Sequence, residues 1–103
     1  MNDNDFGFKL GDLNAIVGAI SKFPDITKAV IFGSRAKGTY KPGSDVDIAV
    51  WSASNESTWQ LSGILNDETL LPYKFDVVNY DKTDNQNLRA QIMGTAVDIY
   101  PEK

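Results

Sequence analysis

Two short stretches of this sequence decide its fold: FGSRAKG at residues 32–38 and SDVDIAV at residues 44–50. The first one ends an apolar, β-branched run at residues 26–32, which predicts a buried strand that stops abruptly at Gly33. In the second, acidic and apolar residues alternate, which predicts a strand over residues 45–51 with one polar and one apolar face. The two strands are therefore joined by a short segment that is rich in glycine and basic residues.

The acidic residues of the second stretch favour a metal site. Asp45 and Asp47 are two residues apart on the predicted strand, so both side chains emerge on one face, with their Cα atoms within about 7 Å. Asp76 lies in an apolar setting within a further predicted strand, residues 73–78. Carboxylates this close repel one another unless a cation or a donor neutralises them. Three oxygen ligands suit Mg²⁺ or Mn²⁺, and such a cluster can hold two ions about 3.5–4 Å apart for phosphoryl chemistry.

Each acid also has a purely structural interpretation. Asp45 follows Gly43 and Ser44 and is equally placed to be a turn residue, and Asp76 is equally placed on an exposed edge. Asp81 is a rival third carboxylate, ranked second because it lies beyond the apolar run. Since an isolated D-x-D pair is a weak motif, the acids alone leave these alternatives open.

Length and composition exclude several classes of protein. The 103 residues fit a single domain, residues 1–103, without room for a large second substrate domain. The absence of cysteine excludes disulfides, thiolate catalysis and sulfur-ligated zinc, and the absence of histidine excludes the Ser-His-Asp triad and imidazole ligands. An enzyme of this composition relies on carboxylates and backbone amides around a hard cation. No apolar run has the length of a membrane span and the N-terminus does not resemble a signal peptide, so we expect a cytoplasmic protein without membrane contact.

The net charge of −4 hides a basic island. Residues 26–44 contain no acid and four bases, namely Lys28, Arg35, Lys37 and Lys41. Such an island favours a small anionic ligand, for instance a phosphate chain, over general nucleic-acid binding. The alternative is that these are ordinary solvated loop residues, and Arg35 has the further alternative of packing or of pairing with an acid such as Asp45.

The remaining elements complete a mixed β-sheet flanked by helices, an α+β fold of the α/β-sandwich type. The first six residues are polar and are expected to fray. Trp51 shares the strand face of Asp47 and either borders a ligand or simply packs. Periodicity and punctuation predict helices at residues 12–23 with Asp12 as cap, at 55–66 with Asn55 as cap, and from Asp84 or Asn85 to Gly94, a turn at 35–39, and a last strand at 97–100.

The two opening stretches resemble a known signature. Gly33 and Ser34, ten intervening residues, and then Asp45 and Asp47 resemble the motif of the DNA polymerase β-like nucleotidyltransferase superfamily. The full strings FGSRAKG and SDVDIAV are similar to its minimal nucleotidyltransferase (MNT) branch, made of short prokaryotic proteins often encoded beside a helical HEPN protein as a toxin–antitoxin pair. Asp76 matches the third acid of the family, and the length of the chain agrees with that branch.

The resemblance implies a nucleotidyltransferase fold and a set of residue roles. Gly33 and Ser34 would hold the nucleotide phosphates, with Lys37 as a further basic contact. The three aspartates would bind two metal ions, Mg²⁺ or Mn²⁺, and Asp76 would also help to deprotonate the attacking hydroxyl. The reaction would be in-line attack on the α-phosphate of a nucleoside triphosphate with release of pyrophosphate.

The resemblance also implies a partner, and it leaves three functional hypotheses. In the first, the protein moves AMP from ATP to a tyrosine of a HEPN toxin and is thereby the antitoxin. In the second, it is a non-catalytic binding module that neutralises the toxin by contact. The third hypothesis, a small-molecule transferase of the antibiotic-modifying type, is weaker because such enzymes usually carry an additional helical domain for the acceptor. We accordingly expect a homo- or hetero-oligomer in which a partner subunit or a second copy completes the site.

Overall fold

A four-stranded sheet is the centre of the computed structural model, which describes residues 2–101. The strands are β1 (Ile26–Phe32), β2 (Val46–Ser52), β3 (Phe75–Asn79) and β4 (Val97–Tyr100), in the spatial order β3-β2-β1-β4. β1 is antiparallel to both β2 and β4, whereas β2 and β3 are parallel. The sheet is therefore mixed, and with its helices it confirms the predicted α+β class.

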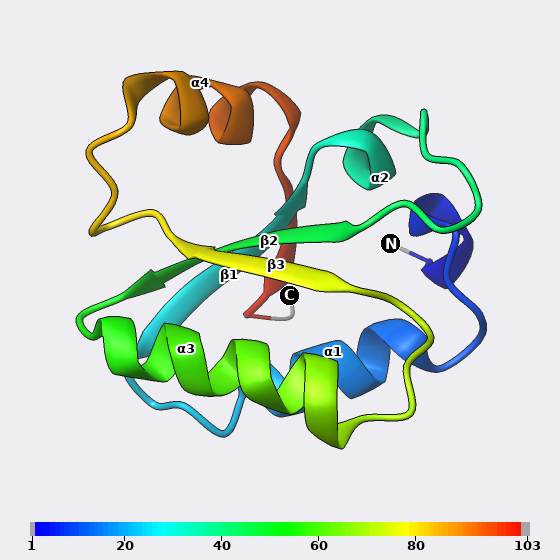
Figure 1. Cartoon of the computed structure of the whole chain (residues 1–103), viewed down its shortest axis with the longest axis horizontal. Helices are drawn as coiled ribbons and strands as arrows, with labels where there is room; N and C mark the ends of the chain where they lie inside the picture. Colours follow the sequence, from blue (N-terminus) through cyan, green and yellow to red (C-terminus); the bar gives the residue numbers. More distant parts are fainter. Residues whose placement is uncertain (1, 102–103) are drawn as a thin grey trace.

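The helices lie on both sides of this sheet, as Figure 1 shows, with α1 and α3 on one side and α4 on the other, whereas the short α2 lies at the end of β1. Their bounds are α1 (Asp12–Ile20), α2 (Ser34–Lys37), α3 (Asn55–Gly63) and α4 (Gln86–Thr95), with a 3₁₀ turn η1 (Asp3–Phe6) and a π-helical turn η2 (Ile64–Glu68) that continues α3. None of the helices between residues 2 and 101 has the length and apolar character needed to span a bilayer.

The two faces of the sheet are covered unequally. On the side of α1 and α3, the large core cluster includes Ile31 of β1, Ile48 and Val50 of β2, and Phe75 of β3, all essentially inaccessible to solvent. The α4 side has a smaller cluster, which consists of Val30, Phe32, Ala49 and Ile92. Because alternate strand residues face opposite sides, Asp47 and Asp76 lie on the α4 side, next to the edge of this smaller cluster.

The N-terminal segment is ordered over its described part, so the expectation that it frays is wrong for residues 2–6; residue 1 lies outside the described residues. Phe6 is 1% exposed, within the large core. The Asp3 carboxylate accepts hydrogen bonds from the backbone N–H groups of Gly11 (3.2 Å) and Leu13 (2.7 Å) at the start of α1. Asp3 therefore satisfies the free amides of this helix, and Asp12, the predicted cap, is instead its first residue.

The other helix ends show which local signals hold. Asn85, one of the two predicted starts of α4, caps this helix, since its Oδ1 accepts a hydrogen bond from the Leu88 amide. The cap of α3 is Ser54, whose hydroxyl accepts from the Glu56 amide, and not the predicted Asn55. α1 ends at Ile20, three residues before its predicted end, and α4 ends at Thr95, one residue beyond. β1 and β4 have the predicted bounds, whereas β2 starts one residue later than predicted.

Candidate active site

Two carboxylates lie side by side at one end of the sheet. Asp47 and Asp76 are the second residues of β2 and β3, and these parallel strands place them directly opposite one another in register. Neighbouring strands are about 4.8 Å apart, so the two side chains emerge next to each other on the same face. Asp81 lies beyond the end of β3 and is exposed, and its amide is bonded to the Asn79 side chain at 3.1 Å. The structure therefore brings Asp76, and not Asp81, beside Asp47.

Asp45 is the third acid of this group, although it precedes β2 and is not part of the strand. Burial raises the pKa of the half-buried Asp47 carboxyl, and the negative charges of Asp76 and then Asp45 raise it further. All three carboxylates are thus close enough to interact electrostatically. This arrangement disfavours the charged form of Asp47 and favours any cation that neutralises the group.

Gly33 connects the two motifs in space. It follows β1 with φ 75° and ψ −149°, a backbone conformation that is essentially restricted to glycine. A Cβ atom at this position would lie 2.6 Å from Oδ2 of Asp47, so only glycine leaves room for that carboxylate. The Gly33 N–H donates to the hydroxyl of Thr95 at 3.0 Å, and this hydroxyl in turn donates to the Gln91 carbonyl. Thr95, at the end of α4, is a site-forming residue that sequence reasoning missed, because no local pattern marks a contact over 62 positions.

The other predicted phosphate contacts lie on α2, directly after Gly33. Ser34 is half-buried, and among residues 2–101 its hydroxyl has no protein hydrogen-bond partner. Lys37 is exposed and, within the same residues, makes no ion pair. The tight turn of α2 is closed by a hydrogen bond from the Lys37 amide to the Gly33 carbonyl. A free hydroxyl and a free ammonium group thus flank the glycine that touches Asp47.

Arg35 has a different environment from the rest of the basic island. It is only 3% exposed, and it donates hydrogen bonds to the carbonyls of Phe6 (2.8 Å) and Ser44 (2.8 and 3.2 Å). Its guanidinium lies over the rings of Phe8, Tyr40 and Tyr73. Of the two predicted alternatives, packing is the one observed, since Arg35 forms no ion pair with an acid among the described residues.

Lys28 and Trp51 lie toward the other end of the sheet, away from Gly33. The Lys28 ammonium is 3.7 Å from Asp98 and lies over the Trp51 ring at 4.9 Å. Trp51 itself stacks on Tyr80, with 4.6 Å between ring centroids. The four-charge island therefore does not persist as one surface in the structure, and Trp51 packs against its neighbours.

The donor set suits a hard divalent cation in its chemistry, because it consists of oxygen ligands that repel one another without a counter-charge. The geometry is not preassembled, however: between residues 2 and 101 no three acidic side chains lie close enough to form a ready-made metal group. The position of Asp45 before β2 gives the physical reason, since the strand pairing aligns Asp47 with Asp76 but does not fix the Asp45 side chain.

Comparison with known families matches most of this chain. A family model described as "Polymerase beta, Nucleotidyltransferase" covers residues 14–103. That range includes every predicted site residue and excludes only the N-terminal segment. None of the curated proteins matches the chain in sequence.

Solved structures with a similar fold include several toxin–antitoxin complexes. One crystal structure, of a toxin–antitoxin with AMP-PNP, has a TM-score of 0.74 and 25% identity, covering 89% of this chain and 75% of the other. A MntA–HepT toxin–antitoxin structure has a TM-score of 0.67 at 22% identity, covering 89% and 72%. A structure of a tri-AMPylated Shewanella oneidensis HEPN toxin in complex with MNT antitoxin has a TM-score of 0.65 at 23% identity, covering 85% and 68%. The last two similarities concern the fold alone.

Proposed function

This chain belongs to the polymerase beta nucleotidyltransferase family, and from that premise we propose that it transfers a nucleoside monophosphate, AMP from ATP, to an acceptor hydroxyl. The acceptor we propose is a tyrosine of a HEPN-type toxin, so that the protein acts as the antitoxin. One observation carries the proposal: Gly33, Asp47 and Asp76 come from three different strands or strand ends and meet at one point. Such a meeting of a glycine turn and paired carboxylates suits the binding of a triphosphate with its cations.

The triphosphate binds, in this proposal, over the turn that begins at Gly33. The glycine allows the phosphates to approach the backbone closely, and the Ser34 hydroxyl, which has no protein partner among residues 2–101, donates a hydrogen bond to them. The Lys37 ammonium, exposed and unpaired within residues 2–101, supplies a positive charge for the phosphate chain. These contacts orient the α-phosphate toward the carboxylates.

Asp45, Asp47 and Asp76 would hold the divalent cations, two Mg²⁺ or Mn²⁺ ions. When bound, the ions neutralise charge on the phosphates and lower the cost of placing the triphosphate beside three acids. Burial, and then the charges of Asp76 and Asp45, raise the pKa of Asp47, and a cation bound there would offset the repulsion among the three carboxylates. In this proposal Asp76, the more exposed of the strand pair, accepts the proton of the acceptor hydroxyl.

The chemical step is in-line attack by the acceptor oxygen on the α-phosphorus. A new oxygen–phosphorus bond forms as the bond between the α-phosphorus and the bridging oxygen breaks, and pyrophosphate leaves with the bonding electron pair. The hydroxyl proton passes to the Asp76 carboxylate. Gly33, Ser34 and Lys37 contribute positioning, so no covalent intermediate with the protein is required.

The partner part of the proposal is supported by the solved structures of similar fold. The structure at 25% identity is a toxin–antitoxin with AMP-PNP, and another contains a tri-AMPylated toxin beside its antitoxin. We propose that residues 1–103 act as a single domain and that the partner subunit presents its tyrosine to the α4 side of the sheet, where Asp47 and Asp76 lie. A hetero-oligomer then completes the active site.

The experiment is co-expression with the product of the neighbouring gene, as the candidate HEPN-type partner, followed by intact-mass measurement of that protein. The wild type is expected to increase the mass of the partner by whole nucleotides. Asp47→Asn should reduce the modification at least about 100-fold, because it removes charge stabilisation of the reacting phosphate. Asp81→Asn is the matched control and should leave modification intact, since Asp81 lies beyond β3.

Two outcomes separate the hypotheses. Modification at the wild-type rate by Asp47→Asn would refute the enzymatic function. If the partner stays unmodified by wild-type protein and growth is nevertheless protected by both the wild type and Asp47→Asn, the protein is instead a non-catalytic antitoxin that acts by contact.

A further inference from the structure

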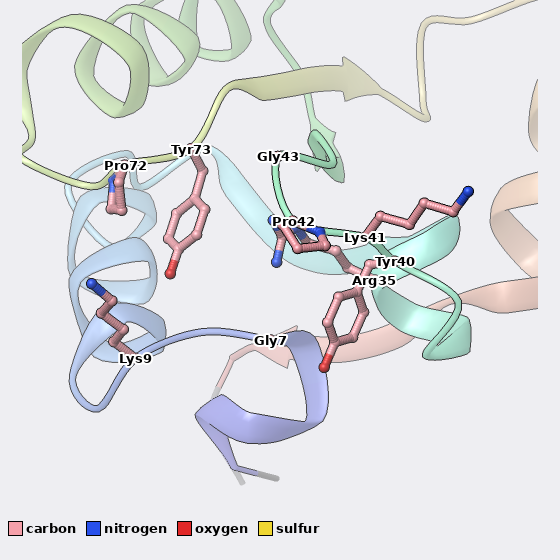
Figure 2. A pocket seen from close by; sticks show the side chains of 9 residues that line it. All are labelled: Gly7, Lys9, Arg35, Tyr40, Lys41, Pro42, Gly43, Pro72 and Tyr73. Atoms are coloured by element: carbon pink, nitrogen blue, oxygen red, sulfur yellow. The ribbon is translucent and has the colours of Figure 1, made fainter.

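A cavity of about 320 Å³ is lined in part by the loop between α2 and β2, which joins the two site motifs. Its walls come from three segments distant in sequence: the stretch between η1 and α1, the α2–β2 loop, and the stretch before β3. Figure 2 shows the rings of Tyr73 and Tyr40 on opposite sides of the hollow, with Lys9 at its rim. None of the six proposed active-site residues lines it.

The cavity lies on the opposite side of the sheet from the carboxylates. Tyr73, one of its walls, packs against the large core of the α1 and α3 side together with Phe6 and Phe8. Asp47 and Asp76 face the α4 side. A ligand in the cavity therefore does not occupy the place of the triphosphate, although both sites share the α2–β2 loop.

The electrostatics of the cavity favour an anion. Its nine lining residues include three bases, Lys9, Arg35 and Lys41, and no acid. The Lys41 ammonium points away from the hollow in Figure 2, so Arg35 and Lys9 are the cations that matter. Asp12 does not line the cavity, but its carboxylate accepts hydrogen bonds from the hydroxyl of Tyr73 and the backbone N–H of Lys9, which both do.

Arg35 is the unusual group of this cavity, because it is a buried cation without an anionic partner among residues 2–101. A guanidinium has five N–H donors, and three of them are used for the carbonyls of Phe6 and Ser44. Two N–H groups, one on each terminal nitrogen, have no protein acceptor within these residues. Arginine cannot lose its proton, so this group stays a cation that carbonyl oxygens and aromatic rings stabilise, and a bound anion would neutralise it.

The walls favour a ligand with a flat, apolar body. The guanidinium lies 5.4 Å from the Tyr40 ring centroid and 4.9 Å from that of Tyr73, and the two rings face the hollow from opposite sides in Figure 2. Pro42 and Pro72 add apolar surface to the walls. A volume of about 320 Å³ is at the lower end of small-molecule sites, which range from about 300 to 1,000 Å³.

We propose that this cavity is a second binding site, for a small organic anion that carries a planar ring and a phosphate or carboxylate group. The anionic group binds the free N–H groups of Arg35, and the ring lies between Tyr40 and Tyr73. Lys9 at the rim adds a second positive charge. The same guanidinium donates a hydrogen bond to the carbonyl of Ser44, the residue before Asp45. Arg35 therefore connects the proposed ligand to the α2–β2 loop that carries Asp45.

Arg35 itself provides the measurement. The sequence contains two arginines, Arg35 and Arg89, so the NMR spectrum of the full ¹⁵N-labelled chain contains two arginine Nε–H signals. Arg89 is an internal reference, because it binds the carbonyls of Tyr80 and Thr83 away from the cavity. Phenyl phosphate and benzoate test the two anionic groups, inorganic phosphate tests the need for a ring, and phenol tests the need for charge.

We expect phenyl phosphate or benzoate to shift the Arg35 Nε–H signal in a saturable way and to leave the Arg89 signal unchanged. The probe that binds more tightly shows whether the site prefers a phosphate or a carboxylate group. Lys9→Glu should weaken this binding about fivefold, because it reverses a rim charge, whereas Lys22→Glu, at an exposed position just after α1, should not. The Asp47→Asn protein should bind the same probe unchanged.

Three results would overturn the proposal. The first is no saturable change at Arg35, or equal changes at both arginines. The second is equal binding of inorganic phosphate or phenol, which would remove the need for a ring with an anion. The third is loss of binding in Asp47→Asn, which would assign the cavity to the active site. Because the probe titration needs neither triphosphate nor partner, failure of the proposed transferase activity leaves it unaffected.

Discussion

Gly33→Ala tests how the site is built. The native φ of 75° and ψ of −149° are nearly inaccessible to alanine, which costs about 1–3 kcal/mol of folding free energy. For a domain of this size that corresponds to a fall in melting temperature of about 4–24 °C. The new Cβ would also lie 2.6 Å from Asp47 Oδ2, and since this oxygen is the end of a flexible side chain, the carboxylate rotates away from its place beside Asp76.

Gly38→Ala is the matched control for this change. Gly38 also has a positive φ, of 80°, but a Cβ there meets nothing within 4 Å. Its substitution should cost about 1–2 kcal/mol through the backbone alone and leave the carboxylates in place. The two variants therefore share backbone strain, and only Gly33→Ala displaces Asp47.

The assay combines thermal unfolding by circular dichroism with titration of a non-hydrolysable ATP analogue in the presence of Mg²⁺, below both melting temperatures. Gly33→Ala is expected to lose at least about tenfold in affinity, because one carboxylate of the metal group is displaced. Gly38→Ala should retain the affinity of the wild type. Equal analogue binding by both folded variants would refute the argument that Gly33 creates the space for Asp47.

Three other changes test the stability of the fold. Asp47→Asn should raise the melting temperature of the metal-free protein, because it removes a half-buried carboxylate that lies near two like charges; a lower melting temperature would contradict this. Gly18→Ala, on an exposed position of α1 with nothing within 4 Å of the new Cβ, should stabilise the protein by about 0.5–1 kcal/mol in urea unfolding. Hydrogen bonds from Ser52 and Ser57 lower the pKa of Asp25 below its ordinary value of 3.8, so the stability they provide is present above pH 3.8 and is lost as the pH falls through the lowered pKa. Asp25→Asn should therefore weaken the acid dependence of urea unfolding below pH 3.8, and an unchanged dependence would refute this.

The parts of the fold that the sequence predicted correctly depend on local patterns. The β-branched run of β1 and the short strand β4 have the predicted bounds, because the residue types within each strand are enough to predict it without distant contacts. The alternation in β2 placed Asp47 opposite the apolar face, as observed. The family motif then joined Gly33 to this strand by resemblance, and the structure explains that spacing, since the glycine and Asp47 are in contact range.

The errors arise from contacts between distant residues. Asp3 binds the start of α1 and Phe6 enters the core, so an N-terminal segment that is polar by composition is ordered by tertiary contacts. Arg35 and Lys28 are both basic residues of one acid-free stretch, yet one is buried among aromatic rings and the other pairs with Asp98. A count of charges along the chain does not distinguish these environments, because each depends on residues that the fold brings from elsewhere.

The topology explains why the first two acids have a recognisable spacing and the third has none. β1 and β2 are antiparallel and joined by residues 33–45, which contain α2, so the end of β1 meets the start of β2 and the distance from Gly33 to Asp47 along the chain is set by that connection. β3 is parallel to β2 and follows a crossover through α3 and η2. A crossover tolerates changes of length as long as β3 starts at the same edge of the sheet. The position of Asp76 is therefore fixed by strand register and not by chain spacing, which is why sequence alone left Asp81 as its rival.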